Sequence, residues 1–460
     1  MLPDVVLLGI FDFYIPKKHF HYYKKQIEAW HRLAHVCRKW RNVVFGSPRR
    51  LNLRLCCGAR TPVREMLDVW PPLPIVIWVH NPDPRDEDNI ASALEHNDRI
   101  CQLVIHDVPS SETEKALTAL QRPFPELTFL LFASCIRTTT PVVPASFLGG
   151  SAPALQTLDL DHIPFPGIPN LLRSATHLVN LHLLKIPHSG YFSPVAMVTA
   201  LSVLTRLESL GIGFESPRSR PDRKTRVPLQ TRTLLPVLTR LRFNGVSEYL
   251  EELVARIDAP VLNNLTVTFF HQLIFDSPHL SQFISRTPKF KAHDEAHVVF
   301  SSFDVTVTLP RTIDGTLELS ISCRRLDWQL LSAAQACSSS LPQALSSTIE
   351  RLYIQSKSRR LQDDIENSQW LELFQPFTAV KDLHISLEFT PSITTALQEL
   401  VGDRVTEMLP ALQTVFFEEP RPSGPVLEAI GQFGVARQLA GRPIAVSRWE
   451  RETRYETNDD

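Results

Sequence analysis

The segment His293-Asp-Glu-Ala-His297 carries side chains that occur in two known catalytic motifs. A zinc protease of the HExxH type places Glu directly after the first His, so that it reaches the metal-bound water, but Asp294 occupies that position here. The same residues spell the Asp-Glu-Ala-His box of helicases, yet the chain has no Gly-Lys pair and therefore no P-loop for nucleotide phosphates. We expect neither chemistry, and a core or surface role for the segment.

Other residues that could bind a metal or act in catalysis also lack the partners that such sites need. His31, His35 and Cys37 fall on one predicted helix without a fourth ligand nearby, and the seven cysteines form no CxxC pair. There is no GxSxG nucleophile motif. We therefore predict no metal, no cofactor and no catalytic residue, which makes a non-enzymatic role the expectation. The rival, an enzyme, would need a pocket of convergent titratable groups that the sequence does not reveal.

The composition excludes several classes of protein. The 460 residues carry a formal net charge of -1 and are 43% hydrophobic, so a mainly disordered chain and a general nucleic-acid binder are both excluded. No apolar stretch is long enough to span a membrane. Scattered cysteines without a disulfide pattern are typical of a reducing compartment. We expect an intracellular protein, cytoplasmic or nuclear or both, with no nucleic-acid or membrane partner.

An apolar pattern of the form Leu-x-x-Leu-x-Leu recurs along most of the chain. Neighbouring copies are 23 to 32 residues apart, except across the interval between 262–267 and 349–354, and this spacing is the regime of leucine-rich repeats. The clear copies are 155–160, 178–183, 207–212, 238–243, 262–267, 349–354, 380–385 and 412–417, and fainter copies are 51–55, 75–79, 100–105 and 127–131. Their irregular length and sequence predict a degenerate repeat.

Alternation within each copy predicts a strand, because residues two apart on a strand share a face. The Leu and Ile side chains would then point into a core shared between neighbouring copies. The predicted fold class is α/β: a curved parallel sheet with outer helices, which is a leucine-rich-repeat solenoid. Predicted return helices are 169–175, 194–204, 248–257 and 326–336, and the runs 298–309 and 315–323 predict a hairpin inserted between repeats.

The side chains between the buried strand positions point outward and could hold a partner. The predicted target-binding residues are Asp159, Asp161, His182, Arg242, Asn244, Thr266, Tyr353 and His384. The sheet fixes their main chain, so little ordering is needed on binding. The alternative is that a target is held by the Arg-rich loop 215–232, whose density of charge and proline indicates an exposed segment.

The first fifty residues predict two apolar helices, at 2–15 and at about 27–45. Pro3 suits a helix start, whereas Gly9 weakens the first helix by about 1 kcal/mol relative to Ala. Two such aromatic-rich helices cannot bury their apolar surface alone. We therefore expect a binding partner for this region.

Leu2-Pro3, the apolar run from Leu7 to Phe11, and Val36-Cys37-Arg38-Lys39-Trp40-Arg41 resemble the F-box over residues 1–46. Together with the Leu-rich remainder, the chain resembles F-box proteins with irregular leucine-rich repeats, of the type expanded in fungi. The resemblance implies a three-helix module that binds the Skp adaptor, and through it a cullin ligase. The implied adaptor-binding residues are Leu2, Pro3, Leu7, Ile10, Phe11, Leu33, Val36, Cys37 and Trp40. An ordinary helical hairpin that caps a repeat domain is the alternative.

These expectations combine into one domain plan. Residues 1–48 form the F-box-like helical domain, residues 49–447 the irregular solenoid with its insertion near 298–323, and residues 448–460 a disordered tail. The predicted function is that of a substrate receptor in an SCF (Skp–cullin–F-box) ubiquitin ligase, which holds an unidentified target protein near the ligase. A repeat scaffold that acts outside any ligase is the alternative.

Overall fold

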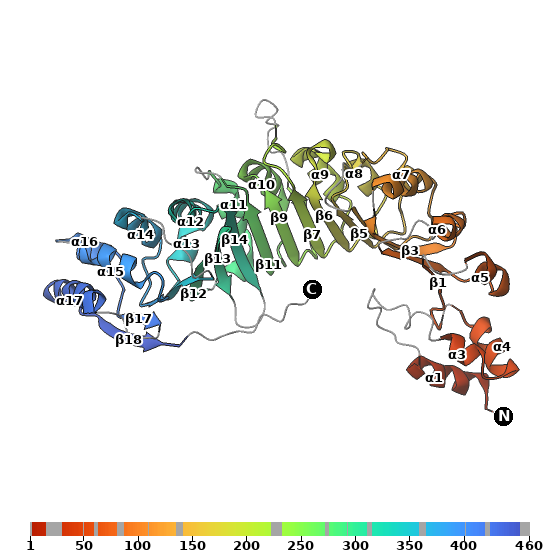
Figure 1. Ribbon diagram of the computed structural model, residues 1–460, viewed down its shortest axis with the longest axis horizontal. Coiled ribbons are helices and arrows are strands. Elements are labelled where there is room, and N and C mark those ends of the chain that lie inside the picture. The colour runs from red at the N-terminus through yellow and green to blue at the C-terminus, as the bar shows by residue number, and fades with distance from the viewer. Residues whose placement is uncertain are drawn as a thin grey trace. The chain divides into compact units, whose positions relative to one another are not determined.

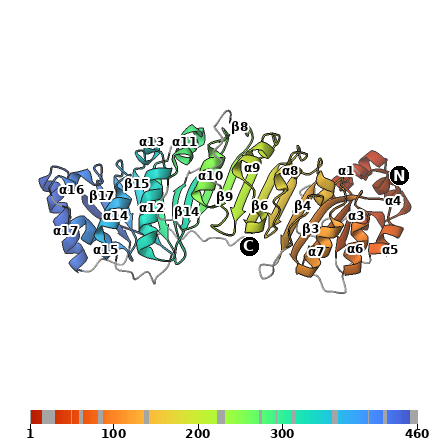
Figure 2. The ribbon, with the colours of Figure 1, turned by 90° about the horizontal axis from the view of Figure 1, so that it is seen from above.

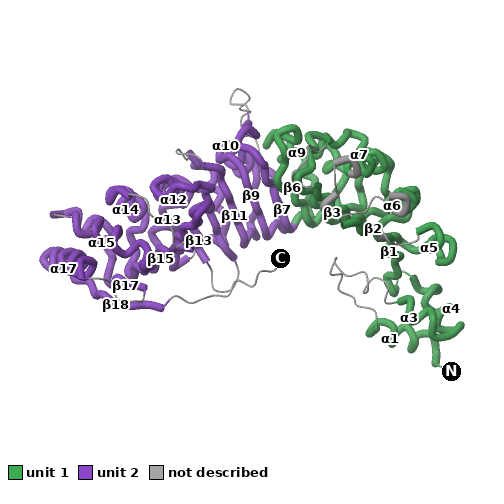
Figure 3. The backbone as a smooth tube through the Cα atoms, in the orientation of Figure 1, with its two compact units in different colours: residues 1–207 green, residues 208–460 purple. Residues whose placement is uncertain are grey.

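The computed structural model describes most of the chain and divides it into two compact units, Met1–Leu207 and Glu208–Asp460 (Figure 3). The described residues are 2–14, 30–48, 50–58, 63–80, 87–108, 110–134, 141–221, 232–271, 276–291, 293–310, 315–357, 365–400, 402–418 and 424–450. Residues 222–231 of the predicted basic loop and 451–460 of the predicted tail therefore lie outside them.

Unit 1 contains six strands that pair in chain order, and every pair is parallel. They are β1 (Leu55–Gly58), β2 (Ile75–His80), β3 (Ile100–Val108), β4 (Phe129–Ser134), β5 (Thr157–Asp161) and β6 (Asn180–Ile186). The helices that follow these strands lie on one side of them (Figures 1 and 2). They are α5 (Val63–Val69), α6 (Glu87–Leu94), α7 (Ser110–Ala119), α8 (Ile168–Leu172) and α9 (Pro194–Leu201).

The alternation predicted for the strands explains this arrangement. In β5, Leu158 and Leu160 are fully buried, while Thr157 and the two aspartates between and after them are half-buried on the opposite face. Proline lies at the start of α8 and α9, where its missing N–H costs nothing: Pro194 opens α9 behind Ser193, whose side chain caps the Ala196 N–H. The predicted α/β class with parallel strands is confirmed for this unit.

Unit 2 has parallel strands on either side of an antiparallel insertion. Its strand order is β7 (Ser209–Phe214), β9 (Arg240–Gly245), β11 (Asn264–Phe269), β14 (Thr316–Ser322), β13 (Asp304–Pro310), β12 (Glu295–Phe300), β15 (Arg351–Ser356), β16 (Asp382–Ile385), β17 (Thr414–Glu418) and β18 (Ala445–Trp449). Two short strands, β8 (Thr233–Leu234) and β10 (Ile257–Asp258), pair separately. Since β18 extends to Trp449, the predicted start of the tail at 448 falls inside a strand.

The insertion differs from the predicted hairpin. It has three strands instead of two, because the run 298–309 breaks at residues 301–303 into the end of β12 and the start of β13. Here the Ser301 hydroxyl accepts the Asp304 N–H at 3.0 Å and closes a tight turn. β13 is antiparallel to both neighbours, while β12 pairs in parallel with β15 and β14 in parallel with β11.

Helices cover one face of the strands of unit 2 and leave the other face bare of helices among the described residues (Figures 1 and 2). They are α10 (Ser247–Val254), α11 (Pro278–Arg286), α12 (Leu326–Ser340), α13 (Gln343–Ser346), α14 (Asn367–Phe374), α15 (Thr390–Gln398), α16 (Arg404–Glu407) and α17 (Gly424–Leu439). Across both units, none of the helices in the described part of the chain has the length and apolar character needed to cross a membrane.

The N-terminal region of unit 1 contains α1 (Asp4–Tyr14), α3 (Trp30–Ala34) and α4 (Arg38–Gly46). The second predicted helix is thus divided in two. The break lies at Cys37, whose extended backbone and side chain cap α4, with the sulfur 3.5 Å from the Trp40 nitrogen. Residues 15–29, which include the start of that predicted helix, lie outside the described residues.

Candidate functional site

The three N-terminal helices share one core with the first strand of unit 1. Leu7, Phe11, Trp30 and Leu33 are buried there together with Leu55 of β1. The Phe11 and Trp40 rings meet edge to face at 4.9 Å, and the Trp30 indole donates to the Arg54 carbonyl at 2.9 Å. These helices and β1 therefore form one packed body, which we call the N-terminal module (residues 2–14 and 30–55).

The opposite side of α1 is an exposed apolar face. Its members recur at positions i, i+3, i+4, i+8 and i+11, so they form one stripe on the helix. Phe13 is 95% exposed, an unusual state for a large aromatic ring. The stripe consists of Leu2, Val5, Val6, Ile10 and Phe13. We call it the α1 stripe.

Charged groups hold α1 in place beside this stripe. Lys39 of α4 donates to the Leu2 carbonyl at 2.6 Å and lies 3.4 Å from the Asp4 carboxylate. Arg50 pairs with Asp12 at 3.3 Å at the other end of the helix. Both pairs are largely exposed, so their stabilising effect is small; one joins α1 to α4 and the other joins α1 to Arg50 beyond the end of α4.

The implied adaptor-binding residues divide between the core and the surface. Leu7, Phe11 and Leu33 are buried in the N-terminal module, so they can support a contact only by holding the module together. Trp40 is half-buried. The exposed members are Leu2, Pro3, Ile10, Val36 and Cys37. Sequence reasoning missed Val5, Val6 and Phe13, although their helical spacing with Leu2 and Ile10 was visible.

Three of the predicted target-binding residues lie in unit 1, on the face opposite its helices. Asp159 and His182 are register partners on β5 and β6, with Nδ1 of His182 3.5 Å from the Asp159 carboxylate. The Asp161 carboxylate lies 2.7 Å from Nδ1 of His162 and 3.4 Å from Nζ of Lys185. Their charges are therefore already engaged within the unit.

The other five predicted residues lie in unit 2, and its pairing register aligns four of them. Arg242, Thr266, Tyr353 and His384 fall on one line across the helix-free face, and Asn244 is two residues further along β9. The same line passes through Glu318, Thr308, His297 and Phe416, which the prediction did not include. The structure thus brings together the predicted residues of unit 2 and adds four more.

Aromatic rings stack along the C-terminal half of this line. Ring centroids lie 4.4 Å apart for His297 and Tyr353, 4.2 Å for Tyr353 and His384, and 4.3 Å for His384 and Phe416, with interplanar angles of 16° or less. We call these four residues the aromatic row. Because the rings stack face to face, they present their edges outward, with the polar atoms of His and Tyr among them.

Trp449 of β18 packs against the aromatic row. Its ring meets His384 edge to face at 5.4 Å and Tyr353 at 5.9 Å, and its indole N–H points to the Ile385 carbonyl at 3.4 Å. Burial, together with Arg351 and His297 nearby, lowers the pKa of His384 to about 4. His384 is therefore neutral at physiological pH and packs as an aromatic ring.

The N-terminal half of the line is polar. Burial raises the pKa of the Glu318 carboxyl, while Arg242 and Lys357 oppose part of that rise. The Thr306 and Ser320 hydroxyls meet at 2.8 Å on neighbouring strands. The helix-free face therefore offers an aromatic part and a part with hydroxyl, carboxyl and guanidinium groups, a mixture suited to binding a polypeptide.

Sequence reasoning could have found the aromatic row. The central residue of each alternating triplet is aromatic in Ala296-His297-Val298, Leu352-Tyr353-Ile354, Leu383-His384-Ile385 and Val415-Phe416-Phe417. His297 was missed because its segment was considered as a metal or helicase motif. In the structure that segment leads into strand β12, and Asp294 pairs with Arg351 at 2.6 Å.

Among the described residues, no group of three or more His, Cys, Asp or Glu side chains could hold a metal ion. His31, from the incomplete set on the predicted helix, stacks on Trp70 at 4.9 Å. Comparison of the chain with models of known protein families found no match, and a search among curated proteins found none either.

Proposed function

We propose that this protein is a non-catalytic substrate receptor of an SCF-type ubiquitin ligase. In this proposal the N-terminal module is a divergent F-box that binds the Skp adaptor, and the strands and helices that follow are an irregular leucine-rich-repeat solenoid that binds a target protein. The observation that carries the proposal is the α1 stripe: four apolar side chains of α1, and Leu2 just before it, remain exposed while the other face of the helix is packed.

The stripe supports binding of a partner for an energetic reason. Exposed apolar side chains on a rigid helix lose little conformational freedom on binding, so most of their burial contributes to affinity. Helix-in-groove recognition uses the same spacing of anchor residues. The resemblance of Leu2-Pro3 and of residues 36–41 to the F-box identifies the proposed partner as the Skp adaptor.

The aromatic row is the proposed target surface. Tyr and Phe are typical anchors of protein interfaces, and the polar half beside the aromatic row can pair with polar groups of a target. The receptor would act by proximity, since it holds the target near the ligase and needs no reacting group of its own. Intracellular localisation, cytoplasmic or nuclear, belongs to the same proposal.

The experiment on the adaptor compares surface and core changes. We expect Val6→Glu with Ile10→Glu to weaken adaptor binding at least about 30-fold, as loss of a hot spot does. Val142→Glu, at another exposed valine of unit 1, should leave binding unchanged. Binding is measured by titration of the purified adaptor, with circular dichroism as the check on folding.

The possible results separate the two functions. Adaptor binding that survives the double change would place the contact elsewhere and contradict the α1 stripe. A folded chain that does not bind the adaptor at all would favour the repeat scaffold acting outside a ligase. For the target, Tyr353→Ala with Phe416→Ala should remove specific proteins from an affinity purification analysed by mass spectrometry. Val261→Ala, at an exposed valine of unit 2 away from this line, should not.

A further inference from the structure

The aromatic row ends at Phe416, and one face of that ring is open. His384 covers the other face, with the two ring centroids 4.3 Å apart, and it is the one ring that Phe416 contacts among the described residues. On the next strand, the register partner of Phe416 is Ser447, whose small side chain is exposed. The row therefore stops one strand before the edge of the sheet, with an uncovered ring face beside the space above Ser447.

The space above Ser447 has the dimensions of one more member of the stack. Ring centroids in the aromatic row lie 4.2 to 4.4 Å apart, close to the spacing of about 4.8 Å between neighbouring strands. A planar group above Ser447 would therefore continue the stack at the same spacing. Trp449 leaves this place open, because its ring lies against Tyr353 and His384 instead.

The charges around this end of the helix-free face are negative. The charged side chains at the outward positions of β16, β17 and β18 are Asp382 and Glu418, both carboxylates. One Glu418 oxygen accepts the Leu387 N–H at 3.1 Å, which leaves the other oxygen free to accept a further donor. Arg448 points to the helix side, because its register partner Phe417 is buried.

The cation nearest to Asp382 in the strand register does not neutralise it. Arg351 is the register partner of Asp382 on β15. Its guanidinium pairs instead with Asp294 at 2.6 Å and with Glu295 at 3.4 Å. A ligand at this end of the row would thus meet an open aromatic face and carboxylates that form no ion pair with the described residues.

We propose that the space above Ser447 binds an arginine side chain of the target protein. A guanidinium is planar and positively charged, so it can stack on the open face of Phe416 and pair with the Glu418 carboxylate. A lysine ammonium would meet the charge but not the flat ring, and an uncharged aromatic ring would leave the carboxylates unpaired. This inference rests on the proposed role of the aromatic row as the target surface, and it names the residue that the row selects.

The chain contains the same combination of groups on α12. The Arg325 guanidinium lies 4.8 Å from the ring centroid of Trp328. It also donates to both oxygens of Asp327, at 3.1 and 2.7 Å. One guanidinium can therefore stack on a ring and pair with a carboxylate at an exposed position of this protein.

The test selects peptides from a displayed random library on the immobilised full-length chain and measures their affinity by fluorescence anisotropy. We expect the selected peptides to share an arginine, and its replacement by lysine to weaken binding at least about 10-fold. Glu418→Gln removes the charge but keeps an oxygen for the Leu387 N–H, and Ser447→Leu fills the space beside Phe416. Each should also weaken binding at least about 10-fold, with circular dichroism as the check on folding.

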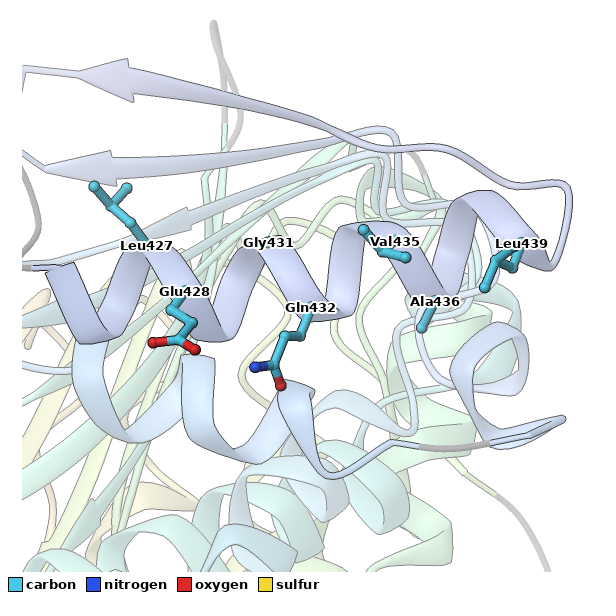
Figure 4. A pocket seen from close by; sticks show the side chains of 7 residues that line it. All are labelled: Leu427, Glu428, Gly431, Gln432, Val435, Ala436 and Leu439. Atoms are coloured by element: carbon cyan, nitrogen blue, oxygen red, sulfur yellow. The ribbon is translucent and has the colours of Figure 1, made fainter.

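The matched control is Glu428→Gln, which removes an exposed carboxylate from α17 on the helix-covered side of the strands (Figure 4). It should leave peptide affinity unchanged. A selection that yields no peptides, or peptides in which lysine or an aromatic residue serves equally well, overturns the proposal. Binding that is insensitive to Glu418→Gln or to Ser447→Leu also overturns it. The selection does not involve the adaptor, so failure of the ligase proposal is read from the adaptor titration alone.

Discussion

The first strand of unit 1 and the last strand of unit 2 both carry apolar side chains on their core-facing side, but these side chains are buried to different extents. The core-facing Leu55 and Cys57 of β1 are fully buried, and the N-terminal module forms one core with Leu55. The core-facing Val446 of β18 is half-exposed. A strand with an apolar face needs a cover, because a single unit cannot bury that face alone. Within the described part of the chain, the first strand thus has a helical cover, whereas Val446 of the last strand remains half-exposed.

What holds the two strands in place differs as well. β1 is held by a cluster of aromatic and aliphatic side chains from α1, α3 and α4. β18 is held by pairing with β17, by Trp449 on the aromatic row, and by its connection to α17. The difference predicts a graded response to mutation, large in the N-terminal module and smaller around β18.

The largest effect is expected from Trp30→Ala in the N-terminal module. Trp30 is 1% exposed, and its ring meets Phe45 and Trp70 at 5.8 and 5.3 Å. We expect a loss of about 3–5 kcal/mol in the free energy of unfolding of the module, as for large-to-small changes in other cores. Urea denaturation followed by Trp fluorescence and limited proteolysis measures this. Unchanged protease resistance of residues 30–55 would show that the helices do not stabilise β1.

A smaller effect is expected from Arg437→Met on α17. The Arg437 guanidinium is completely buried and donates to the Val405 carbonyl at 3.0 Å and the Leu412 carbonyl at 2.9 Å. Met fills most of the volume but leaves two carbonyls without these donors, which should cost about 2–3 kcal/mol. Chemical denaturation gives the value. An unchanged free energy of unfolding would mean that α17 is held mainly by its apolar contacts with α15 and α16. The difference in stability between this region and the N-terminal module would then be larger than expected.

A third prediction concerns the pH dependence of stability that arises from His384 in the aromatic row. Since the pKa of His384 is about 4 in the folded chain and about 6.5 when unfolded, the unfolded chain binds more protons between these values. This contribution to stability is therefore fully present above pH 6.5 and is lost as the pH falls toward 4. Partial exposure limits it to about 1–2 kcal/mol.

His384→Phe tests the pH prediction, because it keeps a ring in the stack and removes the titrating group. The difference in unfolding free energy between the two proteins should change between pH 6.5 and 4 and be constant above pH 7. A difference that does not vary with pH would show that His384 titrates normally and that Trp449 does not shield it.

The smallest effect is expected from Gly9→Ala in α1. A methyl group at Gly9 would meet nothing within 4 Å, so the change should add helix propensity without a clash. We expect the module to gain about 0.5–1 kcal/mol in stability. Thermal unfolding monitors the gain, and adaptor affinity should not fall. A loss of stability would show that α1 requires a glycine at this point.

The sequence predicted the repeating elements well, because alternation and helical spacing depend on burial alone. The strands around Leu158, Leu352 and Leu383 and the helices near 194–204 and 326–336 lie where they were expected. The break at Cys37 was not predicted, since the apolar spacing continues across it while the extended backbone of Cys37 interrupts the helix. Caps of this kind depend on a single local hydrogen bond, which hydrophobic periodicity does not record.

Only part of the candidate site could be predicted from the sequence, and the cause is not the one that hid the helix break at Cys37. Outward positions such as Tyr353 and His384 follow from alternation within one strand, so the sequence identified them. Which residues become neighbours depends on the register between strands and on the antiparallel insertion, and neither can be derived from periodicity. His297 entered the aromatic row only because β12 pairs with β15. Leu7 and Phe11 of α1 are buried within the N-terminal module, and periodicity alone does not say which face of a lone helix is packed.

The reversed order of β12, β13 and β14 has a consequence for how unit 2 acquires its structure. β11 pairs with β14, so Asn264 lies beside Thr316, 52 residues later in the chain. In an array where each strand pairs with the next one in sequence, order can propagate stepwise, and every step closes a loop of similar length. Here the step beyond β11 requires the distant strand β14, which is favourably positioned only after the two local turns of the insertion have formed. We therefore expect formation of the insertion to limit the rate at which unit 2 folds beyond β11. Among the described residues, strand pairing joins β15 to β18 to the earlier strands of unit 2 through this insertion.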